Sequence, residues 1–282
     1  MKQLFASFVS IPVLCMALFF TSCKEKEEVS TTGIYPSALR IVQLCDPQLG
    51  YGEGGFDGDV ANLEKAVMQI NELTPDMVII TGDMVNDNNI EEETISTFHH
   101  VIAHIKAPVL LTPGNNDIPS VTTAGLQYYR DHFGNDFRVV ECKGRCIISA
   151  NSQLWWKENA PQEEVSFQDY LLLKTLRTAK NREQPVVMVT HIPPFNSSAE
   201  EDDDYFNLPK SKRKEALDLC KENNVFLWLA GHTHTTSKRN YGPITILNGE
   251  TTSRNFDGRP LGFRLLTIFP DNRFDWEFIP LN

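Results

Sequence analysis

Short runs of apolar, often β-branched residues alternate along the chain with longer stretches in which apolar residues recur every three or four positions. The short runs are bounded by polar turns and are typical of buried strands. We expect these strands at Ala38–Cys45, Asp76–Thr81, Val109–Thr112, Cys146–Ala150, Pro185–Thr190 and Val225–Ala230. The longer stretches have the 3.6-residue period of amphipathic helices. We expect these helices at Asp59–Leu73, Glu91–Ile105, Thr122–Phe133, Val165–Ala179 and Ser211–Asn223.

The order of these elements predicts the fold class. Strand and helix alternate over most of the chain, which favours βαβ crossovers and largely parallel strands. The last part differs, because Pro243–Leu247, Leu261–Phe269 and Phe274–Ile279 are expected strands with no helix between them. We expect these three strands to run antiparallel. Two packed sheets flanked by helices would accommodate both halves of the chain, so we predict an α/β protein.

The N-terminal segment is unlike the rest. An apolar run, Leu4–Phe20, ends in Phe20-Thr21-Ser22-Cys23, which resembles the lipobox of bacterial lipoproteins. The run is short for a spanning helix, so a transmembrane anchor is the less favoured alternative. We expect a signal peptide over residues 1–22, then an acylated Cys23 and a charged tether over residues 23–37. The protein would be exported and lipid-anchored to the bacterial cell envelope, periplasmic or surface-facing; ordinary cleavage, leaving Cys23 as a thiol, is the alternative.

Composition narrows the range of partners. Residues 38–282 contain no Gly/Ser- or Pro-rich linker, so we expect one domain there. The chain has a formal net charge of −11, which argues against nucleic acid as the main partner, because phosphate contacts need clustered Lys and Arg. Cys142 and Cys146 flank an expected hairpin turn, and a disulfide between them is one alternative, although a protein of this size does not need one.

Candidate chemistry is concentrated in five short polar clusters at the ends of apolar runs. The clusters are Asp46-Pro47-Gln48, Gly82-Asp83, Gly114-Asn115-Asn116-Asp117, Thr190-His191 and Gly231-His232-Thr233-His234. Loops beyond the carboxyl ends of strands form the ligand crevice in α/β folds. A lone aspartate at such a place is more often a turn or helix cap. Together, however, carboxylates, amides and imidazoles form a ligand set for two divalent metals that share one carboxylate.

The order D-x-Q, G-D, G-N-x-D, H and G-H-x-H resembles the calcineurin-like metallophosphoesterase superfamily, from about Arg40 to the end of the chain. Asp46–Gly50 and Glu201–Leu208 are similar to stretches of the calcineurin-like phosphoesterase-domain-containing group of Ser/Thr phosphatases. The resemblance implies a four-layer α/β/β/α sandwich with two mixed β-sheets. It also implies a metal-dependent hydrolase of phosphorylated small molecules or proteins, in which a bridging hydroxide between two metals attacks phosphorus.

The resemblance also implies a role for each cluster. Asp83 would bridge both metals and, with Asn115, Asn116 and Asp117, form the catalytic set. The other implied ligands are Asp46, His234 and Gln48 at one metal, and Asn115, His191 and His232 at the other. The family usually has histidine in place of Gln48, and an amide oxygen binds less well than an imidazole nitrogen. Mixed nitrogen and oxygen ligands suit Mn, Fe or Zn.

Asn116 is the largest departure from the superfamily pattern, which commonly reads G-N-H-D, with a histidine thought to protonate the leaving oxygen. Asparagine has no such proton to donate, and a positioned general acid supplies roughly 10²–10⁴-fold. Three hypotheses follow. The substrates have better leaving groups, as in phosphodiesters, pyrophosphates or aryl esters. Alternatively, Tyr205 or an aspartate of the acidic loop Glu200–Asp204 donates the proton. The third is a catalytically silent lipoprotein that binds phosphate or phospholipid.

Other polar features have simpler interpretations. Gly50–Gly55 formally fits the dinucleotide motif G-x-G-x-x-G, but that fold needs a helix to open at the glycines, and we expect the helix to start near Asp59. We interpret the glycines as a mobile rim loop. The acidic loop is interpreted as a solvated surface turn; the alternative is that it selects against polyanionic substrates or holds cationic ones. The histidines interpreted as surface or packing residues are His99, His100, His104 and His132.

Overall fold

The computed structural model describes residues 37–86 and 91–282. In these ranges the strands are β1 (Leu39–Leu44), β2 (Met77–Ile80), β3 (Val109–Leu111), β4 (Arg138–Cys142), β5 (Arg145–Ser149), β6 (Val186–Val189), β7 (Val225–Ala230), β8 (Ser237–Tyr241), β9 (Ile244–Asn248), β10 (Gly262–Ile268) and β11 (Phe274–Pro280). The helices are α1 (Gly55–Leu73), α2 (Glu92–Ile102), α3 (Thr123–Phe133), α4 (Gln153–Trp156), α5 (Gln162–Asn181) and α6 (Lys210–Glu222). Every element expected from the hydropathy pattern is present.

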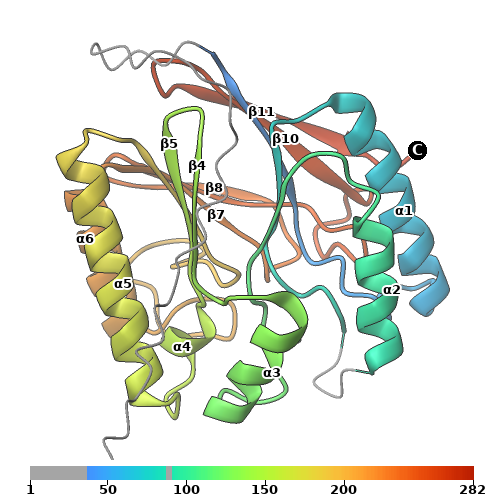
Figure 1. Cartoon of the computed structure of the whole chain (residues 1–282), viewed down its shortest axis with the longest axis horizontal. Helices are drawn as coiled ribbons and strands as arrows, with labels where there is room; N and C mark the ends of the chain where they lie inside the picture. Colours follow the sequence, from blue (N-terminus) through green and yellow to red (C-terminus); the bar gives the residue numbers. More distant parts are fainter. Residues whose placement is uncertain (1–36, 87–90) are drawn as a thin grey trace, which may run out of the picture.

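The strands form two mixed sheets. The first has the order β11-β10-β1-β2-β3, with β1, β2 and β3 parallel and the pairs β1–β10 and β10–β11 antiparallel. The second has the order β4-β5-β6-β7-β9-β8, in which β5, β6, β7 and β9 are parallel and both edge strands are antiparallel to their neighbours. Figure 1 shows α5 and α6 on one side of the molecule and α1 and α2 on the other, with strands between them.

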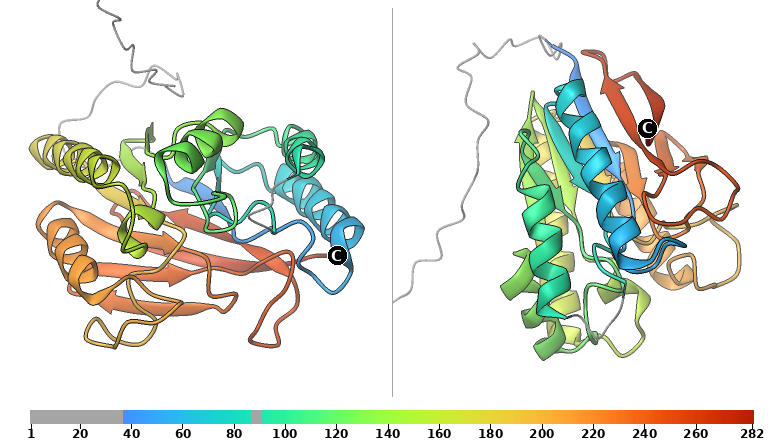
Figure 2. Two further views of the ribbon diagram at one scale, coloured as in Figure 1. Left: turned by 90° about the horizontal axis from the view of Figure 1, so that it is seen from below. Right: turned by 90° about the vertical axis from the view of Figure 1, so that its right-hand side faces the viewer.

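Three apolar layers hold this arrangement together. Because side chains alternate along a strand, Met77 and Ile79 of β2 enter the layer between the two sheets, while Val78 and Ile80 enter the layer shared with the helices. Strand β6 of the second sheet is likewise divided between the inter-sheet layer and a third layer against α5 and α6. The predicted four-layer α/β/β/α sandwich is therefore confirmed, and Figure 2 shows its layers from two further directions.

One part of the predicted topology is wrong. Strand β9 was expected in an antiparallel tail, but it runs parallel to β7 and pairs antiparallel with β8. The hydropathy pattern did not predict β8, because Ser237-Lys238-Arg239-Asn240-Tyr241 is a polar, partly exposed edge strand. Polar residues on an edge strand protect it from pairing with other chains, and they also remove the apolar signal from which strands are predicted.

Helix α1 begins at Gly55, four residues before the expected start near Asp59. The carboxylate of Asp59 turns back and accepts hydrogen bonds from the backbone N–H groups of Gly50 and Gly52, both at 2.9 Å. A dinucleotide site would need such amides to hold a pyrophosphate. Here an internal carboxylate already occupies them, so the glycines build a fixed turn at the start of the helix.

The predicted alternative of a disulfide between Cys142 and Cys146 is wrong. Cys45, Cys142, Cys146 and Cys220 are all thiols. The β4–β5 register places Cys142 opposite Arg145 and Cys146 opposite Glu141. The two cysteines therefore belong to different apolar layers, Cys142 between the sheets and Cys146 on the side of α5 and α6. Residues on opposite faces of a sheet cannot be bridged.

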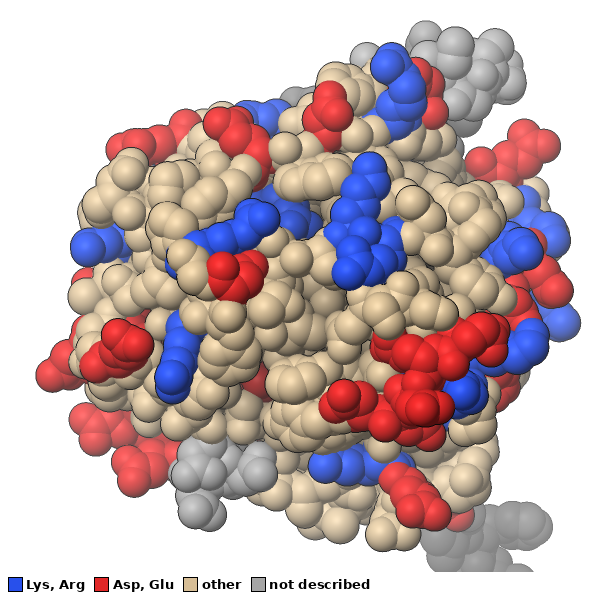
Figure 3. All heavy atoms as spheres, turned by 180° about the vertical axis from the view of Figure 1, so that it is seen from behind, with Lys and Arg blue, Asp and Glu red and all other residues tan. Residues whose placement is uncertain are grey.

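The signal peptide and acylated Cys23 predicted for the N-terminus lie outside the described residues, as does the tether up to residue 36. In the described ranges, none of the helices has both the length and the apolar character needed to cross a bilayer. On the face opposite to that of Figure 1, the largest group of acidic side chains lies at the lower right, while other acidic and basic side chains are spread over several separate places (Figure 3).

Candidate metal centre

The polar clusters meet where the parallel strands of both sheets end. Asp46 follows β1 and Asp83 follows β2 in the first sheet, while His191 follows β6 and His232 follows β7 in the second. All four side chains are buried. Asn115 follows β3 and is partly exposed. The sequence-based expectation that loops at strand ends bring these residues together is confirmed by their positions.

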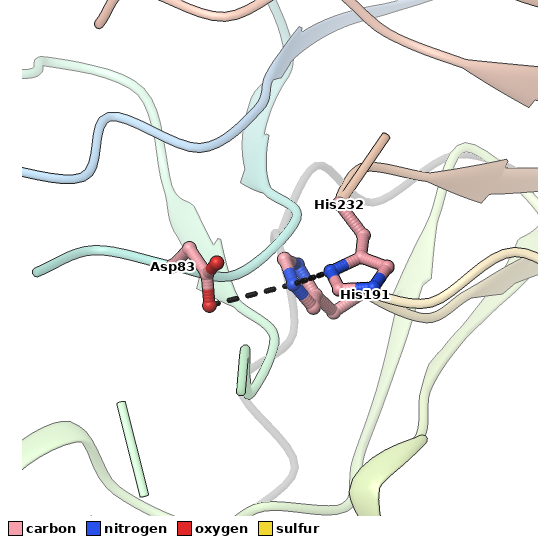
Figure 4. A group of neighbouring side chains, drawn as sticks. All are labelled: Asp83, His191 and His232. Atoms are coloured by element: carbon pink, nitrogen blue, oxygen red, sulfur yellow. Dashed lines mark hydrogen bonds and ion pairs between the residues drawn. The ribbon is translucent and has the colours of Figure 1, made fainter. Parts of the chain in front are cut away.

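Asp83, His191 and His232 form the innermost group. One ligand atom of each lies within 4.8 Å of the others. The Nε2 atom of His191 lies 3.4 Å from Oδ1 of Asp83 and 3.1 Å from Nδ1 of His232. Figure 4 shows the His191 ring between the other two side chains. Asn115 adds a fourth donor atom, because its Oδ1 is 3.1 Å from the same Nε2.

Asp46 and His234 lie on the other side of His191. Oδ1 of Asp46 is 3.8 Å from Nδ1 of His191 and 3.7 Å from Nε2 of His234. The backbone N–H of His232 donates to both oxygens of Asp46, at 3.0 and 3.1 Å, which fixes the carboxylate. Asp46 and His234 thus lie close to each other and to His191, and their assignment to a second metal stays a prediction.

Gln48 lies beside these groups. Its backbone N–H donates to the carbonyl of Asp83 at 2.8 Å, and its side-chain amide donates weakly to Asn86 Oδ1 at 3.4 Å. Its Oε1 is buried and has no hydrogen-bond partner in the described part of the chain. A buried amide oxygen without a partner is costly unless something else satisfies it. Ligation by Gln48 stays a prediction, and this orphaned oxygen fits it.

Each histidine is oriented by a backbone carbonyl. His191 Nδ1–H donates to Thr81 O at 2.8 Å, His232 Nε2–H to Tyr205 O at 2.9 Å, and His234 Nδ1–H to Arg254 O at 2.5 Å. In each ring the other nitrogen faces the cluster. Metal-ligating histidines are typically held in this way, since the outer hydrogen bond fixes both the tautomer and the ring plane.

The distances test whether a metal fits. Donor atoms bound to one ion at about 2.0–2.2 Å lie roughly 3.0–3.5 Å apart in neighbouring positions. The three distances that converge on His191 Nε2 are 3.1, 3.1 and 3.4 Å. The residues present therefore fit a divalent ion held by Asp83, Asn115, His191 and His232. Asp46, His234 and Gln48 offer donors of the same mixed type for a second ion beside it.

The backbone at the predicted ligands is unusual. Ten non-glycine residues in the described chain have a left-handed φ, and half of them are Asp46 (47°), Gln48 (36°), Asp83 (49°), His232 (68°) and His234 (51°). Such conformations cost about 1 kcal/mol or more each and cluster at functional sites. A left-handed residue soon after a strand turns the chain sharply, and here the side chains of Asp83 and His232 point towards His191.

Glycines make room for this packing. A Cβ on Gly231 would lie 2.6 Å from Oδ2 of Asp46, and one on Gly82 would lie 2.5 Å from Nδ1 of His191. A Cβ on Gly114 would collide with the backbone and carboxylate of Asp83. Any side chain at these positions would displace a predicted ligand. The glycine that opens each of these three clusters is therefore required by close approach.

Asn116 and Asp117 do not offer ligands. Asn116 donates to both oxygens of Asp83, through its backbone N–H at 2.9 Å and its side-chain amide at 2.7 Å. Asp117 accepts hydrogen bonds from the backbone N–H groups of Gly114 at 2.8 Å and Met84 at 2.7 Å. Burial, reinforced by nearby Asp83, raises the pKa of Asp117 to about 7. In this arrangement Asp117 is a positioning residue that ties two ligand loops together.

Burial and neighbouring charges together shift the pKa values of the residues in the cluster. Burial raises the pKa of Asp83, but His191 and the Asn116 N–H outweigh it and bring this pKa to about 2. For His191, burial lowers the pKa, but Asp83 and Asp46 outweigh it and raise it to about 9. Burial and the charge of His191 together lower the pKa of His232 to about 3. Buried carboxylates thus create a strong preference for positive charge at the centre.

Sequence reasoning missed the residues that hold the ligand loops. The hydroxyl groups of Thr251 and Ser253 both donate to the carbonyl of Asp46, at 2.8 and 3.0 Å. Neither residue belongs to a cluster or motif, so no signal in the sequence pointed to them. The interpretation of His99, His100, His104 and His132 as surface or packing residues agrees with their places on or beside α2 and α3, where they bond to backbone carbonyls or pack against aromatic rings.

The acidic loop is mostly structural. Glu201 accepts hydrogen bonds from the backbone N–H groups of Asn196 at 2.8 Å and Ser197 at 2.7 Å. The exposed Asp202 and Asp203 form ion pairs with Lys210 at 3.5 Å and Arg213 at 3.7 Å. These contacts favour the interpretation of the loop as a solvated surface turn.

Comparisons with known proteins agree with this geometry. The model of the calcineurin-like phosphoesterase family matches residues 39–236. The serine/threonine-protein phosphatase CPPED1 of Bos taurus is 29% identical over 269 residues, which cover 88% of this chain and 84% of that protein. The probable glycerophosphodiester phosphodiesterase GpdQ of Arcobacter nitrofigilis is 27% identical over 222 residues, covering 76% of this chain and 78% of that protein.

A solved structure shares the fold. A dimetal phosphatase from Danio rerio has a TM-score of 0.63 at 12% identity, covering 86% of this chain and 99% of the other. At that identity the likeness shows the fold alone. The family model, however, spans most of the chain and includes every predicted ligand cluster. This protein therefore belongs to the calcineurin-like phosphoesterase family and is a phosphate-ester hydrolase.

Proposed function

We propose that the protein hydrolyses phosphoesters with two divalent ions, Mn, Fe or Zn, that share Asp83. The observation that carries the proposal is the convergence of Asp83, Asn115 and His232 on Nε2 of His191 at 3.1–3.4 Å. When bound, two such cations neutralise phosphoryl oxygens and acidify a shared water. The residues of the chain hold the ions, orient the ester and keep the crevice open.

The chain departs from its family at Asn116, the position whose usual histidine is thought to protonate the leaving group. The side-chain amide of Asn116 donates to Asp83 Oδ2 at 2.7 Å, so Asn116 supports the shared carboxylate and has no acidic proton to give. Missing general-acid catalysis costs roughly 10²–10⁴-fold and falls hardest on alkyl monoesters. We therefore favour substrates whose leaving groups need little protonation, which are phosphodiesters, pyrophosphates and aryl esters.

One observation favours a second candidate, a Ser/Thr-type phosphomonoesterase with a substitute general acid. The ring of Tyr205 lies 4.9 Å from the ring of the predicted ligand His232, measured between centroids. Tyr205 is therefore near enough to serve a leaving oxygen. Of the other candidates, Asp202 and Asp203 are engaged with Lys210 and Arg213, and Asp204 accepts a hydrogen bond from the backbone N–H of Tyr205.

A substrate panel separates these possibilities. Monoesters, diesters, nucleotides and phosphopeptides would be offered to the protein loaded with Mn²⁺, Zn²⁺ or Fe²⁺, and to Asp83→Asn as a loss-of-function control. We expect metal-dependent turnover that is greatest for diesters and aryl esters and absent from the control. No turnover of any ester by a fully metal-loaded protein would support the third candidate, a catalytically silent protein that binds phosphate or phospholipid.

The Asn116→His variant tests the role of the leaving group directly. We expect it to raise kcat for an alkyl monoester by about tenfold or more and to change aryl ester turnover little, because only the poor leaving group needs the proton. If both substrates respond equally, the missing-acid argument is wrong. Tyr205→Phe supplies the complementary test, because loss of alkyl monoester turnover in that variant would favour the phosphomonoesterase.

The N-terminal sequence supports a proposal about where in the cell the enzyme is located. We propose export and anchoring to the cell envelope through a lipid on Cys23, with nucleic acid an unlikely partner. Mass spectrometry of the N-terminal peptide from the producing cells would detect the acyl chains. A Cys23→Ser variant should move to the soluble fraction, and an unmodified Cys23 in the wild-type protein would rule the anchor out.

A further inference from the structure

Aromatic side chains surround the metal centre one layer outside the ligands. On one side, the ring of Phe256 stacks on that of His234 with centroids 4.8 Å apart, and the ring of Tyr51 lies 5.5 Å from the same imidazole. Phe256 is 47% exposed. Phe256 therefore does not fill the core, because about half of the residue is exposed to solvent beside the predicted ligand His234.

A second aromatic group stands over the other histidine. The rings of Tyr205, Phe206 and Trp156 have centroids 4.9, 5.6 and 5.8 Å from that of His232. Tyr205 is 53% exposed. Because each aromatic group packs on a different histidine of the cluster, the two groups flank the metal centre at His234 and at His232. We call Tyr51, Phe256, Trp156, Tyr205 and Phe206 the aromatic rim.

Each side of the aromatic rim carries a cation. The guanidinium of Arg254 lies 5.7 Å from the ring of Tyr51 and 5.8 Å from that of Phe256, and Nζ of Lys157 lies 3.7 Å from the ring of Trp156. In the described part of the chain neither Arg254 nor Lys157 has a carboxylate partner within ion-pair distance. Two cations without partners favour an anionic ligand, although the protein as a whole is acidic.

Hydrogen bonds hold one side of the rim rigidly against the metal centre. The backbone N–H of Phe256 donates to the carbonyl of His234 at 2.9 Å, while His234 Nδ1–H donates to the carbonyl of Arg254. Tyr51 is fixed because Asp59 accepts hydrogen bonds from the amides of both its neighbours, Gly50 and Gly52. Pre-organised rings lose little freedom when a ligand arrives.

We propose that the aromatic rim binds the organic part of the substrate and selects a planar ring over a saturated group of equal size. The proposal rests on the proposed function, because a phosphate at the metal centre places the first atoms of its organic group beside Phe256 and Tyr205. A planar ring can stack on these side chains and meet Arg254 through its face. A saturated ring gains only burial. The substrate class is therefore a phosphoester of an aromatic or heteroaromatic group.

The test uses two ligands that cannot be hydrolysed and differ only in the ring. Benzylphosphonate and cyclohexylmethylphosphonate would be titrated calorimetrically into the full chain loaded with Mn²⁺. We expect the benzyl compound to bind about threefold to tenfold more tightly. Phe256→Leu should abolish this preference and Phe256→Tyr should retain it. Phe167→Leu, which removes a ring that is 55% exposed on α5, is the matched control and should leave the ratio unchanged.

The ratio of the two affinities distinguishes a binding role from a structural one, because a disturbed metal centre would weaken both phosphonates equally. Equal affinities in the wild-type protein, or an unchanged ratio in Phe256→Leu, would overturn the rim proposal. Hydrolysis of an aryl phosphate is measured separately. A ring preference without any hydrolysis would reject the proposed function and support the rim proposal. Hydrolysis without a ring preference would support the proposed function and reject the rim proposal. Failure to take up Mn²⁺ or to bind either phosphonate would overturn both proposals.

Discussion

The loop that holds Asp46 offers a sharp test of how the centre is built. Thr251 is completely buried, and its hydroxyl group donates to the carbonyl of Asp46 at 2.8 Å. The same hydroxyl oxygen accepts a hydrogen bond from the backbone N–H of Ser253 at 2.9 Å. Thr251→Val keeps the size and branching of the side chain but removes both bonds. The hydroxyl of Ser253 still reaches the Asp46 carbonyl at 3.0 Å, so this carbonyl keeps one donor.

The magnitude follows from these contacts. Losing one neutral hydrogen bond costs about 0.5–1.5 kcal/mol, and leaving the buried N–H of Ser253 without an acceptor costs about 1–3 kcal/mol. We therefore expect Thr251→Val to lower the free energy of unfolding by about 1.5–4.5 kcal/mol. In a chain of this length that corresponds to a Tm lower by roughly 3–9 °C. Because the Asp46 turn loses a support, metal affinity should fall about tenfold or more.

Thermal unfolding followed by circular dichroism, and titration of the metal-free protein with Mn²⁺, measure the two effects. Thr178→Val is the matched control, because its hydroxyl also donates to a backbone carbonyl, at 2.8 Å, but on the exposed face of α5. That change should cost less than about 0.5 kcal/mol. Equal Tm values for the two variants, or an unchanged Mn²⁺ affinity in Thr251→Val, would refute the positioning role of the loop.

Two further predictions concern close packing and pH. Gly231→Ala would place a Cβ 2.6 Å from Asp46 Oδ2, so the metal content measured by mass spectrometry should fall by more than half. Gly58→Ala is the control, because its Cβ would meet no atom within 4 Å, and this variant should retain its full metal content. Burial raises the pKa of Glu201, but hydrogen bonds led by that of Ser197 outweigh it and bring this pKa to about 2 from 4.5. A depressed carboxyl pKa stabilises the fold above about pH 4.5, and this stabilisation is lost as the pH falls towards 2. After discounting for solvent screening, Glu201→Gln should cost about 1–2 kcal/mol in urea unfolding at pH 7 and roughly half of that or less at pH 3; an equal cost at both pH values would contradict this assignment.

Much of the fold and the ligand set follows from the sequence for one physical reason. Strands buried on both faces appear as continuous apolar runs, and a polar cluster directly after such a run has to lie at the edge of the sheet. For this reason the sequence predicts that Asp46, Asp83 and His191 lie close together. The edge strand β8 is not predicted by the sequence, because its residues are polar and its position depends on pairing with β9.

The remaining parts of the site could not be predicted because they depend on contacts between distant segments. Thr251 meets the carbonyl of Asp46 across more than two hundred positions of sequence. Phe256 and Arg254 lie in a loop without secondary structure, which no periodicity marks. The resemblance implies a catalytic role for Asp117, and its hydrogen bonds from Gly114 and Met84 add a structural role that the motif does not predict. A motif records which residues occur together and not which atoms meet.

The left-handed backbone of the ligands links the stability of the sandwich to its chemistry. Five predicted ligands adopt a positive φ, and at about 1 kcal/mol or more each the sum is a sizeable part of a typical folding free energy of about 5–15 kcal/mol. Hydrogen bonds such as those from Thr251 to Asp46 and from Asn116 to Asp83 offset part of this cost, and the apolar layers hold the strand ends in place. Ile79, between the sheets, is completely buried two residues before Thr81, whose carbonyl orients His191. A cavity at Ile79 would therefore relax the turns as well as destabilise the fold, and metal affinity should decline together with stability.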